Sequence, residues 1–152
     1  MKTLTTLLII GMLATVVAIA DDVADVKEAG QRFYAALSAG DAGALMQLHA
    51  SASSSFGPGG GLLETFDTLE ERRNSFQATV DAGVKLDIQG RHIDVRVLGN
   101  STAVATSYGV GTITQPDGTV TPTNNGITRV RIKQGGQWKQ VHNHISPLRL
   151  PQ

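Results

Sequence analysis

Two histidines near the end of the chain are the residues best suited to chemistry. His142 and His144 are separated by one residue within the segment Trp138–Ser146. Because side chains alternate between the two faces of a β-strand, both imidazoles would share one face. Histidine titrates near neutral pH, so such a pair can act as a general base or bind a substrate. The alternative interpretation is that both are hydrogen-bonded scaffold residues that hold the last strand in place.

Other reactive arrangements receive little support. A metal site at the two histidines would need a third ligand from another strand, such as His92 or Asp94, and no metal is predicted. His49 falls in a predicted helix and is interpreted as a packing residue. Ser51 and Ser53–Ser55 lack a nucleophile-elbow motif. The chain has no cysteine, which excludes thiol chemistry and disulfides, and no cofactor is predicted.

The first twenty residues are typical of a targeting segment. Lys2 precedes the mostly apolar run Leu4–Ile19, and Ala18–Ala20 forms the small-x-small site that a signal peptidase needs. The run is too short for a comfortable transmembrane helix, although a retained N-terminal anchor is the alternative. We therefore expect residues 1–20 to be a signal peptide. Residues 21–152 would then be exported as one domain, either periplasmic or secreted.

The amino-acid composition and net charge argue against some classes of binding partner. Lysine and arginine number 13, as do aspartate and glutamate, and removal of Lys2 leaves about one net negative charge. Without a basic patch, nucleic acid and anionic membrane surfaces are poor candidate partners. An aromatic content of 5% argues against a broad stacking platform for sugars or bases.

The N-terminal third of the mature chain predicts helices. One amphipathic helix follows the cleavage site and ends at Ala39-Gly40, with apolar positions at Val23, Val26, Gly30, Phe33 and Leu37 and with Tyr34 beside them. Asp41 caps a second, shorter helix that carries Leu45, Met46 and Leu48.

A loop and a third helix come next. Ser51–Gly61 is rich in serine and glycine and predicts a mobile loop. Thr68 and Glu71 form a capping-box pattern, which predicts a helix from Thr68 to Gly83. The charged residues of this helix, among them Arg72, are interpreted as its solvated face.

The hydrophobic period changes to two after Gly83, which indicates strands. Strands are predicted over Val84–Val97, with a bulge at Gly90, and over Thr102–Thr114, Ile127–Lys133 and Trp138–Ser146. Helices followed by consecutive strands indicate an α+β fold, in which a curved antiparallel sheet carries helices on one face.

The last hairpin allows a finer prediction. If Gly135-Gly136 are the central residues of a primed turn, Gln134 faces Gln137. Counting onward pairs Arg131 with Gln140, Val130 with Val141, Arg129 with His142 and Ile127 with His144. Trp138, Arg129 and both histidines would then share one face, which would be a ligand cavity or a subunit interface.

These residues resemble a known family. The end of the chain, with Thr128-Arg129-Val130, Gly135-Gly136, Trp138, Val141-His142, His144 and Ser146, is similar to the association (hub) domain of calcium/calmodulin-dependent kinase II and its small bacterial relatives. These belong to the nuclear transport factor 2-like superfamily, with SnoaL-like cyclases and ketosteroid isomerases. The resemblance implies a cone-shaped, strongly curved antiparallel sheet with three N-terminal helices on its concave face, a cystatin-like fold.

The resemblance also implies a cavity. In the kinase hub arginines line part of it, and Arg129 falls on one of those positions, whereas Ile145 and Gly109 replace two others. Ketosteroid isomerases need a tyrosine and an aspartate, and these positions are Phe33 and Gly57 here, with Tyr34 one residue away. Isomerisation by that mechanism is therefore not expected.

We expect a homodimer, formed through the open face of the sheet, that binds a small apolar or acidic organic molecule between helices and sheet. The predicted ligand-binding residues are His142, His144, Arg129, Tyr34, Phe33 and Tyr108. One alternative is an enzyme, a SnoaL-like isomerase, cyclase or hydratase that uses a pocket histidine and a water. The other is an oligomerising hub without a ligand of its own.

Overall fold

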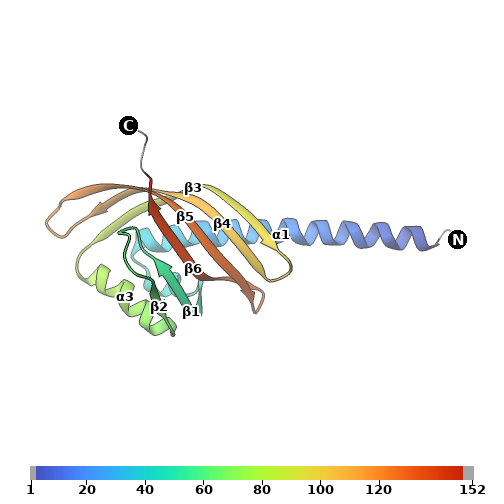
Figure 1. Ribbon diagram of the computed structural model, residues 1–152, viewed down its shortest axis with the longest axis horizontal. Helices are drawn as coiled ribbons and strands as arrows, with labels where there is room; N and C mark the ends of the chain where they lie inside the picture. The colour runs from blue at the N-terminus through green and yellow to red at the C-terminus, as the bar shows by residue number, and fades with distance from the viewer. Residues whose placement is uncertain (1–2, 149–152) are drawn as a thin grey trace.

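The computed structural model describes the backbone of residues 3–148 and the side chains of residues 21–148. The elements in chain order are α1 (Thr3–Ala39), α2 (Ala42–Met46), β1 (His49–Phe56), β2 (Glu64–Phe66), α3 (Leu69–Asp81), β3 (Lys85–Leu98), β4 (Thr102–Thr114), β5 (Val120–Gln134) and β6 (Gln137–Pro147). All six strands form one sheet in the order β2-β1-β6-β5-β4-β3. The sheet curves strongly, and α1 runs along one face of it (Figure 1). The predicted α+β class is confirmed.

The helix ends follow the capping rules. The side chain of Asp41 accepts a hydrogen bond from the amide of Ala44 at 2.9 Å, which caps α2 as predicted. The predicted capping box of α3 is confirmed, because Thr68 Oγ1 accepts from the amide of Glu71 and the Glu71 carboxylate accepts from the amide of Thr68. In the described part of the chain, no helix is long and apolar enough to cross a membrane.

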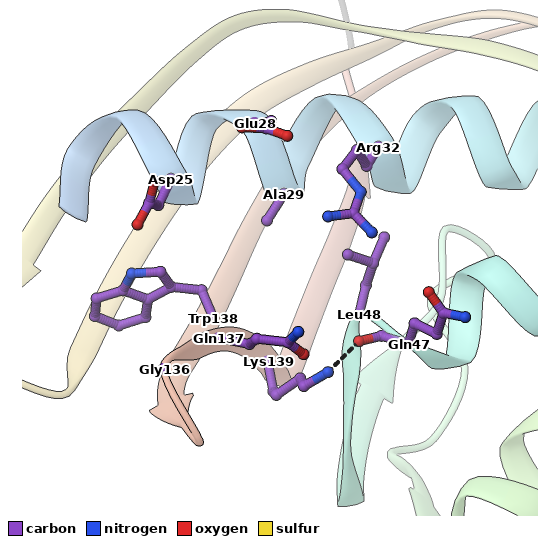
Figure 2. A pocket seen from close by; sticks show the side chains of 10 residues that line it. All are labelled: Asp25, Glu28, Ala29, Arg32, Gln47, Leu48, Gly136, Gln137, Trp138 and Lys139. Atoms are coloured by element: carbon purple, nitrogen blue, oxygen red, sulfur yellow. Dashed lines mark hydrogen bonds between the residues drawn. The ribbon is translucent and has the colours of Figure 1, made fainter. Parts of the chain in front are cut away.

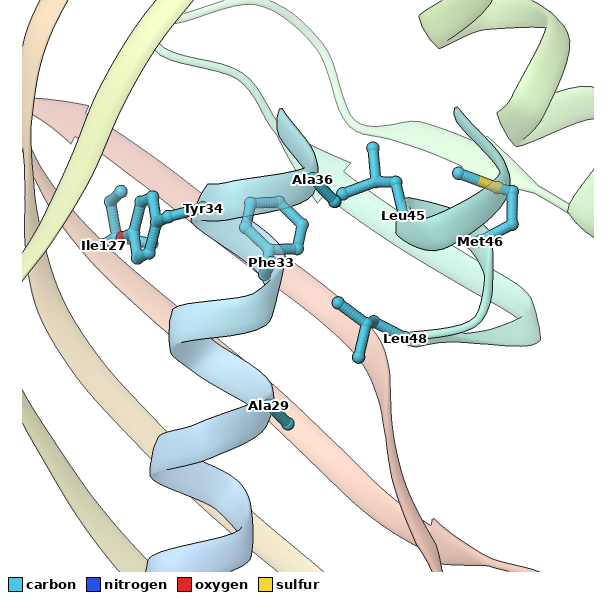
Figure 3. Close-up of a cluster of buried hydrophobic side chains, with 8 residues drawn as sticks. All are labelled: Ala29, Phe33, Tyr34, Ala36, Leu45, Met46, Leu48 and Ile127. Carbon is cyan, nitrogen blue, oxygen red and sulfur yellow. The ribbon is translucent and has the colours of Figure 1, made fainter. Parts of the chain in front are cut away.

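The core lies where α1 and α2 meet the sheet. The larger cluster combines α1, α2, β5 and the α2–β1 connection (Figure 3), through Ala29, Phe33, Tyr34, Ala36, Leu45, Met46, Leu48 and Ile127. A smaller cluster joins Val26 of α1 to Ala103, Ala105 and Trp138 of the sheet. We call the side of the sheet that carries these residues its inner face, and the opposite side its outer face. None of the residues of α3 is buried.

The segment predicted as the loop Ser51–Gly61 instead begins in a strand. β1 pairs in parallel with β6 and antiparallel with β2, so the sheet is not wholly antiparallel. His49, predicted in a helix, is the first residue of this strand. Serine has no strong preference for strands, and partners more than 80 residues away in the sequence hold β1 in place, as in the pairing of Ser54 with His142. Local sequence therefore carried no signal for β1.

The irregularity in β3 lies two residues beyond the predicted bulge at Gly90. The register with β4 shifts between Arg91 and Asp94, and His92 adopts φ +50° there. Gly90 has a different role, because a Cβ at this position would lie 2.2 Å from Cε2 of Tyr34. β4 has the predicted bounds, whereas β5 starts seven residues earlier than predicted.

The register of the last hairpin agrees with the prediction only near its turn. Gln134 pairs with Gln137 and Arg131 pairs with Gln140, as expected. The register then shifts, so that Val130 pairs with His142 and Arg129 with Asn143. The extra residue in β6, Val141, turns every later side chain of that strand to the opposite face. The predicted pairings of Val130 with Val141, Arg129 with His142 and Ile127 with His144 are therefore wrong.

Candidate functional site

Arg129 lies at the centre of the inner face. Its side chain is 4% exposed, and its guanidinium carbon lies 4.1 Å from the ring centroid of Phe33 and 4.7 Å from that of Tyr34. Nη1 of Arg129 donates to the hydroxyl oxygen of Tyr34 at 3.0 Å. Since an arginine only donates, the Tyr34 proton is free to point to Ser107 Oγ, 2.9 Å away. Burial lowers the pKa of Arg129, and Tyr34 partly opposes this.

Arg131 lies two residues further along β5, on the same face. Its side chain is 0% exposed, and its Nη atoms donate to the carbonyls of Trp138 and Ala29, each at 3.4 Å. Burial, followed by the charge of Arg129, lowers the pKa of Arg131 to about 10. The group nevertheless stays cationic at neutral pH. Two positive charges are thus buried side by side on one strand.

A third arginine reaches the same region from α3. Nε of Arg72 donates to Ser53 Oγ at 2.8 Å, and its guanidinium carbon lies 4.3 Å from the ring centroid of Phe66. Burial lowers the pKa of Arg72, and the carboxylate of Glu64 partly opposes this. The sequence-based interpretation of Arg72 as part of a solvated face is wrong.

The pKa of His49 is affected both by burial and by the charges of the three arginines. Its Nδ1 lies 2.9 Å from the carbonyl of Leu45 and its Nε2 lies 3.0 Å from Nε2 of Gln140. The carbonyl requires a proton on Nδ1, so Nε2 accepts from the Gln140 amide and the ring is neutral. Burial lowers the pKa of His49 to about 3, helped by Arg72 and, more weakly, by Arg131 and Arg129. His49 is buried, in agreement with its prediction as a packing residue.

The buried charges of Arg129 and Arg131 have no acidic partner among the described residues. Among the side chains of residues 21–148, no aspartate or glutamate is buried. Three guanidinium nitrogens lack a hydrogen-bond partner within that part of the chain: Arg72 Nη2, Arg129 Nε and Arg131 Nε. The amide oxygens of Gln140 and Asn143 lack a donor as well. Buried donors without acceptors are suited to holding an anion.

The predicted ligand-binding residues divide between the two faces of the sheet. Phe33, Tyr34 and Arg129 come together inside, as described above. His142 and His144 lie on the outer face, where their ring centroids are 6.0 Å and 5.4 Å from that of Phe56. Tyr108 is 45% exposed on the outer face of β4.

Sequence reasoning missed Arg131 as an interior residue and Arg72 as a half-buried one. The period of two along β5 places Arg131 on the same face as Arg129, so this signal was available. Arg72 had no comparable signal, because α3 carries charges around much of its circumference.

Several open cavities adjoin the described part of the fold, among them the following three. One of about 380 Å³ separates α1 from the β5–β6 turn (Figure 2). A mainly apolar one of about 330 Å³ lies between the end of α1, α3 and the start of β3. One of about 530 Å³ is centred on the outer face and includes His92, Tyr108 and His144. Within the described side chains, no group of three acidic, histidine or cysteine residues is arranged to hold a metal ion.

Solved structures share this architecture. A ketosteroid isomerase-like protein from Erwinia carotovora atroseptica is 20% identical, with a TM-score of 0.73 over 85% of this chain and 98% of that chain. The calcium/calmodulin-dependent kinase II hub homology domain of Chlamydomonas reinhardtii is 23% identical, with a TM-score of 0.64 over 84% and 98%. A nuclear transport factor 2-like protein with a cystatin-like fold from Novosphingobium aromaticivorans is 18% identical, with a TM-score of 0.68 over 90% and 88%.

At these identities the likeness establishes the fold. A comparison with curated proteins gave no significant match. A family model described as the SnoaL-like domain matches residues 26–149, which include α2, α3, the whole sheet and most of the part of α1 that packs on it. The chain belongs to the SnoaL-like domain family.

Proposed function

We propose that this domain binds a small organic anion, a carboxylate, between α1, α3 and the inner face of the sheet. The observation that carries the proposal is the buried pair of positive charges on Arg129 and Arg131, beside which no aspartate or glutamate is buried in the described part of the chain. Burying a charge without a partner costs several kcal/mol, whereas a carboxylate can accept two parallel hydrogen bonds from one guanidinium. The rings of Phe33 and Tyr34 provide an apolar wall for the rest of the molecule.

A ligand would have to pass α3 to reach the arginines in the interior. None of the residues of this helix is buried, and Arg72 is tied to β1 by its hydrogen bond to Ser53. An element with so little buried surface opens at low cost in free energy. A ligand that accepts a hydrogen bond from Arg72 in place of Ser53 would therefore allow α3 to move away from β1. The helix would pack back against the sheet once the ligand is bound.

Thermal unfolding with acetate or benzoate tests the arginine site, with chloride at equal ionic strength as reference. At a hundredfold excess over Kd, a bound anion adds about 2.7 kcal/mol to the free energy of unfolding, and Tm rises. We expect Arg129→Met and Arg72→Met to lose this rise. Arg73→Met, a matched change at an exposed position of α3, would retain it. An equal rise in all variants, or none in the unmodified protein, would contradict the proposal.

We further propose that residues 1–20 direct export and are then removed. The support is the apolar run and the A-I-A site described above, and the domain match begins only at residue 26. N-terminal sequencing of protein recovered from its own host would give Asp21 as the first residue. Recovery of the intact N-terminus in the membrane fraction would instead indicate a retained anchor.

Self-association is a second candidate function, and the apolar side chains exposed on the outer face favour it. The outer face exposes Phe56, Tyr108 and Val110, and two solved relatives are named as kinase association or hub domains. Large exposed apolar side chains gathered on one face are typical of protein–protein interfaces. We propose a homodimer through this face.

A further inference from the structure

We propose that the cavity between α1 and the β5–β6 turn binds a short peptide of two or three residues through its free termini. None of the three arginines lines this cavity, of about 380 Å³, although Arg131 supports two of its walls from beneath. Its walls come from α1, from the α2–β1 connection and from the start of β6 (Figure 2). We call it the terminal groove, and its key residues are Asp25, Arg32 and Trp138.

The two ends of the terminal groove carry opposite charges. Asp25 and Arg32 both project from α1 toward the groove, Asp25 beside Trp138 and Arg32 beside Leu48 (Figure 2). Both are exposed, and neither forms an ion pair among the described side chains, where the one salt bridge joins Lys133 to Asp22. A carboxylate and a guanidinium that do not pair with each other can receive an ammonium and a carboxylate from one molecule.

The spacing of these charges selects the length of the ligand. Seven residues along a helix separate Asp25 from Arg32, which is about 10 Å at 1.5 Å per residue. A single amino acid is too short to reach both ends. An extended chain spans roughly 3.3–3.6 Å per residue, so two or three residues cover about 7–11 Å.

Trp138 supplies a third polar group at the Asp25 end of the groove (Figure 2). The side chain is 4% exposed, and its indole Nε1 is buried without a hydrogen-bond partner among the described residues. An indole N–H can only donate, so it needs a carbonyl oxygen. A peptide bond of the ligand would provide this oxygen, whereas a simple diamine or dicarboxylate would match only one end.

The groove is held open before any ligand arrives. Arg131 lies beneath it and bonds the carbonyl of Ala29 on one wall and that of Trp138 on the other. Lys139 donates to the carbonyl of Gln47, and Lys133 pairs with Asp22 at 2.5 Å next to the groove. A preformed site loses less conformational entropy on binding than one that must be ordered.

The single tryptophan of the chain makes the test direct. We would titrate the exported form of the protein with dialanine and trialanine and follow Trp138 fluorescence, with calorimetry as a second readout. Saturable binding is expected. N-acetylation or C-amidation of the same peptides should each weaken it by about tenfold or more, since each removes one charge-assisted contact.

Substitutions of Asp25 and Arg32 test which end of the terminal groove binds which terminus of the peptide. Asp25→Asn should bring unmodified and N-acetylated peptides to similar affinity, and Arg32→Gln should do the same for C-amidated peptides. Both positions are exposed, so the fold should survive, and Tm checks this. Arg129→Met should leave peptide binding unchanged, which separates this site from the carboxylate site. Equal binding of blocked and free peptides, or no binding at 10 mM (about the weakest affinity of interest), would overturn the proposal.

Discussion

At the scale of the residue, the interior brings several positively charged groups close together. Burial, helped by the charges of the three arginines, keeps His49 neutral, and His49 in turn orients Gln140 beneath them. The sequence placed Arg129, Phe33 and Tyr34 in the site, through the family motif and helical spacing. It could not place His142, because one inserted residue in a strand reverses the face of everything after it.

The stability of the fold should fall as the pH falls from about 6.5 to about 3. The folded pKa of His49 is lowered to about 3, so the unfolded chain binds a proton in this window and the folded chain does not. The free energy of unfolding should therefore drop by about 1.4 kcal/mol per pH unit. Urea unfolding at several pH values measures this slope.

The variant His49→Gln removes that titration. Its slope between pH 6.5 and 3 should be smaller by the contribution of one proton, with the circular dichroism spectrum at pH 8 unchanged. A variant slope equal to that of the unmodified protein would exclude His49 as its source.

At the scale of the element, the contact between α1 and β3 depends on the lack of a side chain at Gly90. The ring of Tyr34 occupies the space where residue 90 would carry a Cβ. Sequence reasoning correctly predicted the caps Asp41 and Thr68, the bounds of β4 and the presence of three helices, because these depend on neighbouring residues. It was wrong on the start of the first helix, which was expected after residue 20, whereas α1 begins at Thr3. It missed β1, whose partners in β6 are far away along the chain.

Replacing Gly90 with alanine should displace Tyr34 and destabilise the fold. A Cβ 2.2 Å from Cε2 forces the ring or the strand to move, which costs about 1–3 kcal/mol. The hydrogen bond from Arg129 to Tyr34 should weaken with it. Gly57→Ala is the matched control, since no atom lies within 4 Å of its Cβ position. Chemical denaturation of both variants gives the comparison, and equal stability would argue against the close contact.

At the scale of the whole molecule, the fold class followed from the order of helices and strands, and the C-terminal motif indicated the likeness to SnoaL-like proteins that the family model bears out. Neither could indicate where β1 joins the sheet. The outer face, with Tyr108 and Phe56, is the part of the surface through which we propose that the homodimer forms.

Tyr108→Glu should convert a dimer to monomer, because a carboxylate at the centre of an apolar interface must be desolvated without a partner. Light scattering after gel filtration measures the mass. Leu62→Glu makes the same kind of change at a position that is 91% exposed, outside the sheet, and should leave the mass unaltered. Dimers of both variants would place the interface elsewhere.

The parallel pairing of β1 with β6 has a kinetic consequence. His49 and Gln140, which meet in the interior, are 91 residues apart in the chain. Contacts of such high sequence separation slow folding, since a long loop must close before they form. The strand that completes the sheet is also the last to be synthesised. The arginine-lined interior therefore cannot close until the C-terminal hairpin arrives, and chains truncated before β6 should remain unfolded.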